Sequence, residues 1–167
     1  MNTEIQAWLT GRLPDDWFED TPDITVDREE IQVVGRIPRP DGSDDDPAAR
    51  AAEQGRIGRF REQTREARMR IAREAEHHFG RKIAWGAACG DTRVVFTSLS
   101  VPVMTRLRQP ERIVLDTLVD AGVARSRSDA LAWCVRLVAQ HTGDWLAELR
   151  EAMRQVEEVR DRGPGAA

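Results

Sequence analysis

The chain has 167 residues, 40% of them hydrophobic, which suffices for one medium domain or two small ones with a buried core. Its 25 Lys and Arg against 29 Asp and Glu give a net charge of −4, which argues against a uniformly basic nucleic-acid coat protein. No apolar run approaches the roughly 18 residues of a membrane helix, and the amino terminus is acidic, unlike a signal peptide. We therefore expect a cytoplasmic protein with no membrane contact.

Charge is distributed unevenly along the chain. Residues 1–47 hold 4 Arg against 13 Asp and Glu, a balance of −9. Residues 50–82 hold 10 Arg and Lys against 5 Glu, a balance of +5. The acidic segment 1–47 is therefore suited to cover the basic middle of the chain or to bind a basic protein partner.

Strand and helix patterns begin near the amino terminus. Residues 3–9 predict a short helix that ends at Thr10-Gly11. Residues 24–27 and 31–37 predict a β-hairpin. The stretch 39–47, which contains Pro, Gly and four Asp, predicts a solvated loop.

A helical pattern then runs from Pro47 to His78, with a break expected at Gly55–Gly58. Apolar residues recur every three or four positions, and most arginines lie off that stripe at distances suited to ion pairs with glutamates. This pattern favours a solvated, ion-paired face, with a surface for nucleic acid or an acidic partner as the alternative. Residues 82–89 and 92–97 predict a second hairpin.

Residues 55–58 (GRIG), followed by a basic helix and FGRKIAW (79–85), faintly resemble the GXXG-helix-strand part of a KH-type RNA-binding domain. That resemblance implies RNA contacts through Arg56 or Arg59. Taken as a whole, we expect residues 1–97 to form an α+β domain built as β-hairpin, helix and β-hairpin.

Catalytic patterns are missing from the sequence. No nucleophile-base set, phosphate loop or metal-ligand spacing occurs. Cys89 and Cys134 lie in apolar stretches without the spacing of metal ligands, and His77 and His78 suit a helix end. We therefore expect no enzyme activity, no cofactor and no metal site.

The most informative stretch is residues 101–138. Val103, Thr105 and Leu107 alternate with Met104, Arg106 and Arg108, as in a strand with one apolar face. Pro110 suits the first turn of a helix, Gly122 suits its end, and Ser128 suits the cap of a second helix. The order of strand, helix, glycine-bearing turn and helix resembles the ribbon-helix-helix fold of the MetJ, Arc and CopG-like DNA-binding proteins.

The resemblance implies a homodimer in which the strands of two copies pair and enter the major groove of double-stranded DNA. Such a protein would be a sequence-specific transcriptional regulator. By position, Arg106 would read guanine edges and Met104 would contact bases. The phosphates would be held by Arg108, Arg125, Ser126, Arg127 and Ser128.

We expect the ribbon-helix-helix domain to span residues 98–140, with Pro102 marking its beginning because proline cannot donate a ladder hydrogen bond. Residues 141–167 would add a carboxyl-terminal helix and a frayed tail, with apolar residues at heptad-like spacing that suit a subunit contact. Three alternatives remain open. The fold could serve only for dimerisation in an antitoxin-like or other protein-interaction module, the protein could bind RNA through its Arg-rich helix, or the stretch could pack inside another α+β domain.

Overall fold

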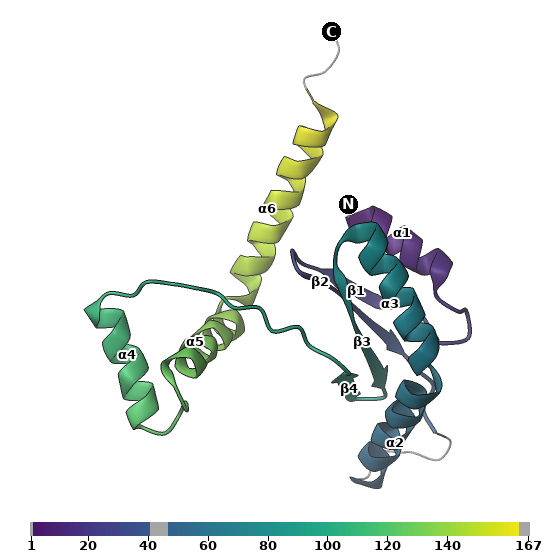
Figure 1. Cartoon of the computed structure of the whole chain (residues 1–167), viewed down its shortest axis with the longest axis horizontal. Helices are drawn as coiled ribbons and strands as arrows, with labels where there is room; N and C mark the ends of the chain where they lie inside the picture. The colour runs from purple at the N-terminus through teal and green to yellow at the C-terminus, as the bar shows by residue number, and fades with distance from the viewer. Residues whose placement is uncertain (1, 41–46, 164–167) are drawn as a thin grey trace. The chain divides into compact units, whose positions relative to one another are not determined.

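The computed structural model describes residues 2–40 and 47–163, and the chain forms two compact units, Met1–Val103 and Met104–Ala167 (Figure 1). The expected α+β class is confirmed. The domain boundary expected after residue 97 and the boundary between the units both lie within residues 96–108, which contain neither helix nor strand. Most of the loop predicted at 39–47, and the predicted frayed tail, lie outside the described residues.

The first unit is a four-stranded sheet with three helices (Figure 1). Its strands lie in the order β1-β2-β3-β4; β2 and β3 are parallel, and the two outer pairs are antiparallel. A parallel pair needs a long crossover connection, and two consecutive helices, α2 and α3, supply it here. The predicted order of hairpin, helix and hairpin is confirmed. The bounds are α1 (Asn2–Arg12), β1 (Asp23–Val26), β2 (Glu30–Arg36), α2 (Pro47–Gln63), α3 (Arg65–Phe79), β3 (Lys82–Cys89) and β4 (Thr92–Val95).

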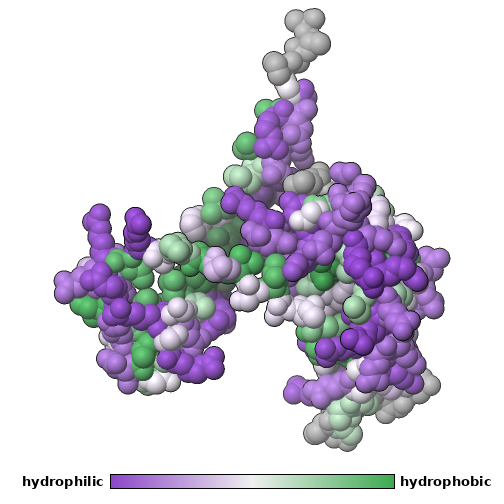
Figure 2. All heavy atoms as spheres, viewed as in Figure 1, coloured by the Kyte–Doolittle hydropathy of each residue, from purple (hydrophilic) through white to green (hydrophobic). Residues whose placement is uncertain are grey.

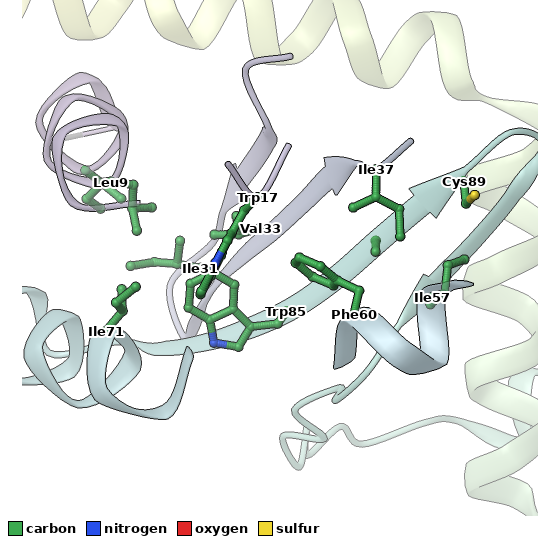
Figure 3. Packing of buried hydrophobic residues seen from close by; sticks show 12 residues of the cluster. Leu9, Trp17, Ile31, Val33, Ile37, Ile57, Phe60, Ile71, Trp85 and Cys89 are labelled. Carbon is green, nitrogen blue, oxygen red and sulfur yellow. The ribbon is translucent and has the colours of Figure 1, made fainter. Parts of the chain in front are cut away.

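The core of this unit lies between one face of the sheet and the helices. Alternation along β2 and β3 places Val33 opposite Trp85, and both are buried on the same face. Leu9 of α1, Phe60 of α2 and Ile71 of α3 belong to the same buried cluster (Figure 3). Apolar residues from all three helices therefore cover this face of the central strands.

Two predicted helix boundaries are wrong. Helix α1 continues through Thr10-Gly11, because the Leu13 amide still donates to the Leu9 carbonyl at 2.8 Å. The break in the long helix falls at Thr64 rather than at Gly55–Gly58, and both glycines lie inside α2. Residues 55–58 therefore form no GXXG loop, and the KH-type resemblance is wrong.

Arg68 holds the junction between α2 and α3. Its guanidinium donates to Thr64 Oγ1 at 2.9 Å and to the Arg61 carbonyl at 2.6 Å, and it lies 4.9 Å from the Phe96 ring centre. Only 7% of Arg68 is exposed, although the sequence grouped it with the surface arginines. Burial lowers the pKa of Arg68 to about 10, so the side chain remains charged at neutral pH.

The turn between β3 and β4 is fixed by a buried carboxylate on α2. Glu53 is 3% exposed and accepts a hydrogen bond of 2.6 Å from Thr92 Oγ1. Gly90, in this turn, has a φ of +56°, and a Cβ there would collide with Glu53 and Arg39. The hydrogen bond from Thr92 is the main cause that lowers the pKa of Glu53. The predicted Gly90-Asp91 turn is confirmed, with Cys89 paired to Thr92.

The second unit contains three helices: α4 (Gln109–Asp120), α5 (Arg127–His141) and α6 (Gly143–Arg162). Within residues 2–40 and 47–163, no helix has the length and apolarity that crossing a bilayer requires.

Candidate nucleic-acid interface

The centre of the second unit is the helix pair predicted from the sequence. Pro110 lies in the first turn of α4, where its missing N–H has no partner to lose. Gly122, with a φ of +73°, follows the end of α4 and allows the Val123 amide to donate to the Leu118 carbonyl at 3.0 Å. The chain thereby reverses and enters α5.

Helix α5 is capped by Ser126 rather than by Ser128. Ser126 Oγ accepts from the Asp129 amide at 3.2 Å, and Asp129 Oδ2 accepts in return from the Arg125 amide at 3.0 Å. Ser128 lies inside the helix and is exposed. A side-chain oxygen three residues before the donor is the usual capping geometry, so the Ser126 to Asp129 spacing was the available signal.

The segment before α4 forms no strand with any described part of the chain. Val103 is 85% exposed and Met104 is 95% exposed, whereas Leu107 is partly buried against the core of the helix pair. Of the predicted apolar face only Leu107 is packed, whereas Val103 and Thr105 are exposed like Met104, so a single chain does not show the predicted alternation. A strand needs a partner, and the ribbon-helix-helix resemblance places that partner in a second subunit.

The arginines predicted to contact DNA differ in their surroundings. Arg106 and Arg108 are exposed and form no ion pair with a described residue. The side chain of Arg125 is 94% exposed and lies 3.5 Å from Asp129 Oδ2. The guanidinium groups of Arg106 and Arg108 are available to an incoming phosphate or base, and Arg125 shares its exposed guanidinium with Asp129.

Arg127 is ion-paired with Asp116. Its Nε and Nη2 donate to the two carboxylate oxygens of Asp116 on α4 at 2.6 Å and 2.7 Å. The hydrogen bonds from Arg127 hold the pKa of Asp116 below its ordinary value. This fork links α4 to α5, and sequence reasoning missed it because the partners are 11 positions apart on different helices. The structure brings Arg125, Ser126, Arg127 and Ser128 together at the amino end of α5.

The second unit buries little of its own apolar surface. Only Leu115, Ala124 and Ala130 are buried among its described residues, and they form one small cluster. Hydrophobic residues instead lie at the surface along α4, α5 and α6 (Figure 2). Those exposed on the three helices are Ile113, Val114, Val135, Leu137, Val138, Trp145, Leu149, Met153, Val156 and Val159.

No metal site emerges from the described part of the chain, where no three His, Cys, Asp or Glu side chains are placed to share an ion. His78 instead stacks on Trp8, with ring centres 6.3 Å apart.

Comparison with known proteins separates the same two parts. Residues 3–95 match the family described as Rv1265-like protein, N-terminal domain, and residues 108–160 match the Mb1296 C-terminal domain. Uncharacterized protein Rv1265 of Mycobacterium tuberculosis and uncharacterized protein Mb1296 of Mycobacterium bovis are each 58% identical to the chain over 157 residues. The matched region is 94% of this chain and 69% of each relative. The chain belongs to the Rv1265-like family.

No solved structure matches this Rv1265-like chain. Its two matched regions correspond to the two compact units, and residues 96–107 lie between them. Met104 and Arg106 belong to this intervening segment, whereas Arg125 to Ser128 lie within the matched Mb1296 C-terminal domain.

Proposed function

We propose that this protein is a homodimeric, sequence-specific DNA-binding regulator of the ribbon-helix-helix type. In this proposal, residues 103–108 of two copies pair as an antiparallel ribbon that enters the major groove. The two α4 and α5 helix pairs form the shared core beneath that ribbon.

The observation that carries the proposal is the incompleteness of the second unit in one chain. A unit of this size with three buried apolar residues gains too little hydrophobic free energy to offset the entropy lost when its helices become ordered. The segment before α4 likewise pairs with no strand of the described chain. A second copy would satisfy both needs, because it would cover the apolar faces and pair with the segment.

The placement of Leu107 supports the predicted phase of the ribbon. With Leu107 packed inward, period-2 alternation turns Arg106 and Met104 to the opposite face. The planar fork of Arg106 can donate two hydrogen bonds to the O6 and N7 atoms of guanine. Arg106 is therefore the residue we assign to base reading.

The phosphate contacts are assigned to Arg108 and Arg125, with the free amides at the start of α5. Arg127 is a weaker candidate than the sequence indicated, since binding phosphate would require it to leave Asp116 or to share its guanidinium. Asp129 also lies in the first turn of α5, where its charge opposes an incoming anion.

The test is selection of bound duplexes from a random library at near-physiological salt, with wild type, Arg106→Ala and Arg125→Ala in parallel. Arg150→Ala is the matched control, because it removes an arginine from α6 in the same unit. We expect wild type to enrich a symmetric motif. Arg106→Ala should lose about 1–3 kcal/mol at that motif and relax one position in each half-site.

Arg125→Ala should weaken binding to all sequences and reduce the dependence of affinity on salt. A folded, dimeric wild-type protein that enriches no motif would refute the proposal and favour the protein-interaction alternative. Equal, uniform losses from Arg106→Ala and Arg125→Ala would refute the separation of base-reading and phosphate-binding roles.

A further inference from the structure

The first unit contains a recess that its fold does not explain. The recess has a volume of about 610 Å³ and lies between Pro38-Arg39, which follow β2, and one face of α2. Ala52, Gly55, Arg56 and Arg59 line it from α2, at spacings of three and four residues that place them on a common helix face. A volume of this size lies within the range of small-molecule sites in proteins, roughly 300–1,000 Å³.

The described lining of this recess includes three arginines and no acidic residue. We call the recess with Arg39, Arg56 and Arg59 the arginine pocket. Arg56 Nε donates to the Pro38 carbonyl at 3.2 Å, which orients the guanidinium and leaves its terminal N–H groups without a hydrogen-bond partner among the described residues. Arg59 forms no ion pair with any described residue. Two cationic groups of the arginine pocket therefore lack a carboxylate among the described residues.

Two carboxylates, Glu53 and Asp91, hold Arg39 in place. Its Nη2 lies 3.4 Å from Glu53 Oε1 and 3.9 Å from Asp91 Oδ1. The hydrogen bond from Thr92 and the nearby Arg39 both lower the pKa of Glu53, so this buried carboxylate is ionised at neutral pH. Glu53 thus anchors Arg39 without lining the recess itself.

The two small residues of α2 shape the floor of the pocket. A Cβ built on Gly55 would meet no atom within 4 Å, so the glycine faces open space rather than a packed neighbour. Ala52 lies one turn before Arg56 and is also small. No large side chain therefore covers this part of α2, and a ligand can approach the helix backbone closely.

We propose that the arginine pocket binds a small phosphorylated molecule that carries at least two phosphate groups. Guanidinium groups bind phosphate oxygens through paired, charge-assisted hydrogen bonds, and three of them line one recess here. A single inorganic phosphate would fill only a small part of the volume. The proposal concerns the first unit alone and does not depend on DNA binding by the second.

The experiment measures binding of pyrophosphate and of ATP to the full chain by isothermal titration calorimetry at low salt, with adenosine as the uncharged comparison. The variants are Arg59→Ala and Arg59→Lys. Arg73→Ala is the matched control, since it removes an exposed arginine from α3 outside the recess. Thermal melting by circular dichroism verifies that each variant is folded.

We expect saturable binding of pyrophosphate and ATP but not of adenosine. Arg59→Ala should weaken binding about 10- to 100-fold, because it removes a charge-assisted pair of hydrogen bonds. Arg59→Lys should retain part of the affinity, and Arg73→Ala all of it. Absence of saturable binding by wild type, or equal affinities of wild type and Arg59→Ala, would overturn the proposal.

A single-stranded RNA decamer serves as the competing ligand. Tighter binding of RNA than of pyrophosphate, with similar losses in Arg59→Ala and Arg73→Ala, would also overturn the proposal. That outcome would assign the arginines to an extended nucleic-acid surface instead of a small-molecule pocket.

Discussion

Dimerisation of the second unit can be tested at Val135, on the exposed side of α5. The side chain is 62% exposed in one chain, and replacing valine by alanine removes about two CH₂ equivalents. At about 0.8 kcal/mol for each CH₂ buried, covering the exposed part would contribute roughly 1 kcal/mol in each copy. A symmetric dimer counts the loss twice, so Val135→Ala should weaken dimerisation by about 2 kcal/mol, roughly 30-fold in Kd.

The assay is sedimentation equilibrium of the full chain over a wide range of protein concentrations. The higher helix propensity of alanine offsets part of this loss, because α5 gains order when the two copies associate. Met69→Ala is the control: Met69 is 47% exposed on α3 of the first unit, and its loss should leave the Kd unchanged. An unchanged Kd in Val135→Ala, or a wild type that stays monomeric at high concentration, would refute the dimer interface.

Three further predictions follow from single contacts. Gly90→Ala should destabilise the fold by about 1–3 kcal/mol in denaturant titration, because the φ of Gly90 is +56° and a Cβ there would collide with the Glu53 carboxylate. Gly11→Ala is the comparison: Gly11 lies inside α1 with no neighbour within 4 Å, so alanine there should stabilise the fold slightly. Arg12 donates to Glu74 at 2.6 Å, and this hydrogen bond lowers the pKa of Glu74. Wild type should therefore be more stable than Glu74→Gln above the ordinary glutamate pKa, and this difference should disappear as the pH falls through the lowered pKa of Glu74. A stability difference that stays constant with pH would contradict this. Asp116→Asn should strengthen nonspecific DNA binding and steepen its salt dependence, because Asp116 holds the Arg127 guanidinium, which is predicted to lie near phosphate. Weaker DNA binding in filter-retention assays would contradict that placement of Arg127.

The sequence predicted those parts of the fold that follow from local periodicity. Short apolar runs at residues 31–37 and 82–89 identified the central strands of the sheet, and Gly90-Asp91 identified the turn of the second hairpin. The break at Thr64 was missed because Arg68 determines it by reaching back to the Arg61 carbonyl and across to Phe96. That contact joins segments far apart in the sequence, and no local pattern encodes it.

The candidate interface was predictable to a similar extent. Pro110 and Gly122 mark the two ends of α4 because proline lacks an N–H and glycine tolerates positive φ. The cap of α5 was assigned two residues too late, although the spacing of Ser126 and Asp129 already matched a capping box. The pairing of Arg127 with Asp116 depends on how α4 packs against α5, which requires tertiary structure.

If a second copy completes the second unit, dimerisation and DNA binding are thermodynamically linked. DNA that binds only the dimer stabilises it by mass action, so a weaker dimer must show weaker DNA binding at protein concentrations below its Kd. Val135 has no assigned DNA contact, yet Val135→Ala should reduce occupancy of the selected motif at low concentration and recover it fully at high concentration. Arg106→Ala should behave oppositely, with affinity reduced even for the preformed dimer. Titration of DNA at protein concentrations on both sides of the dimer Kd distinguishes the two variants, and identical concentration dependence in both would break the proposed link between subunit assembly and base reading.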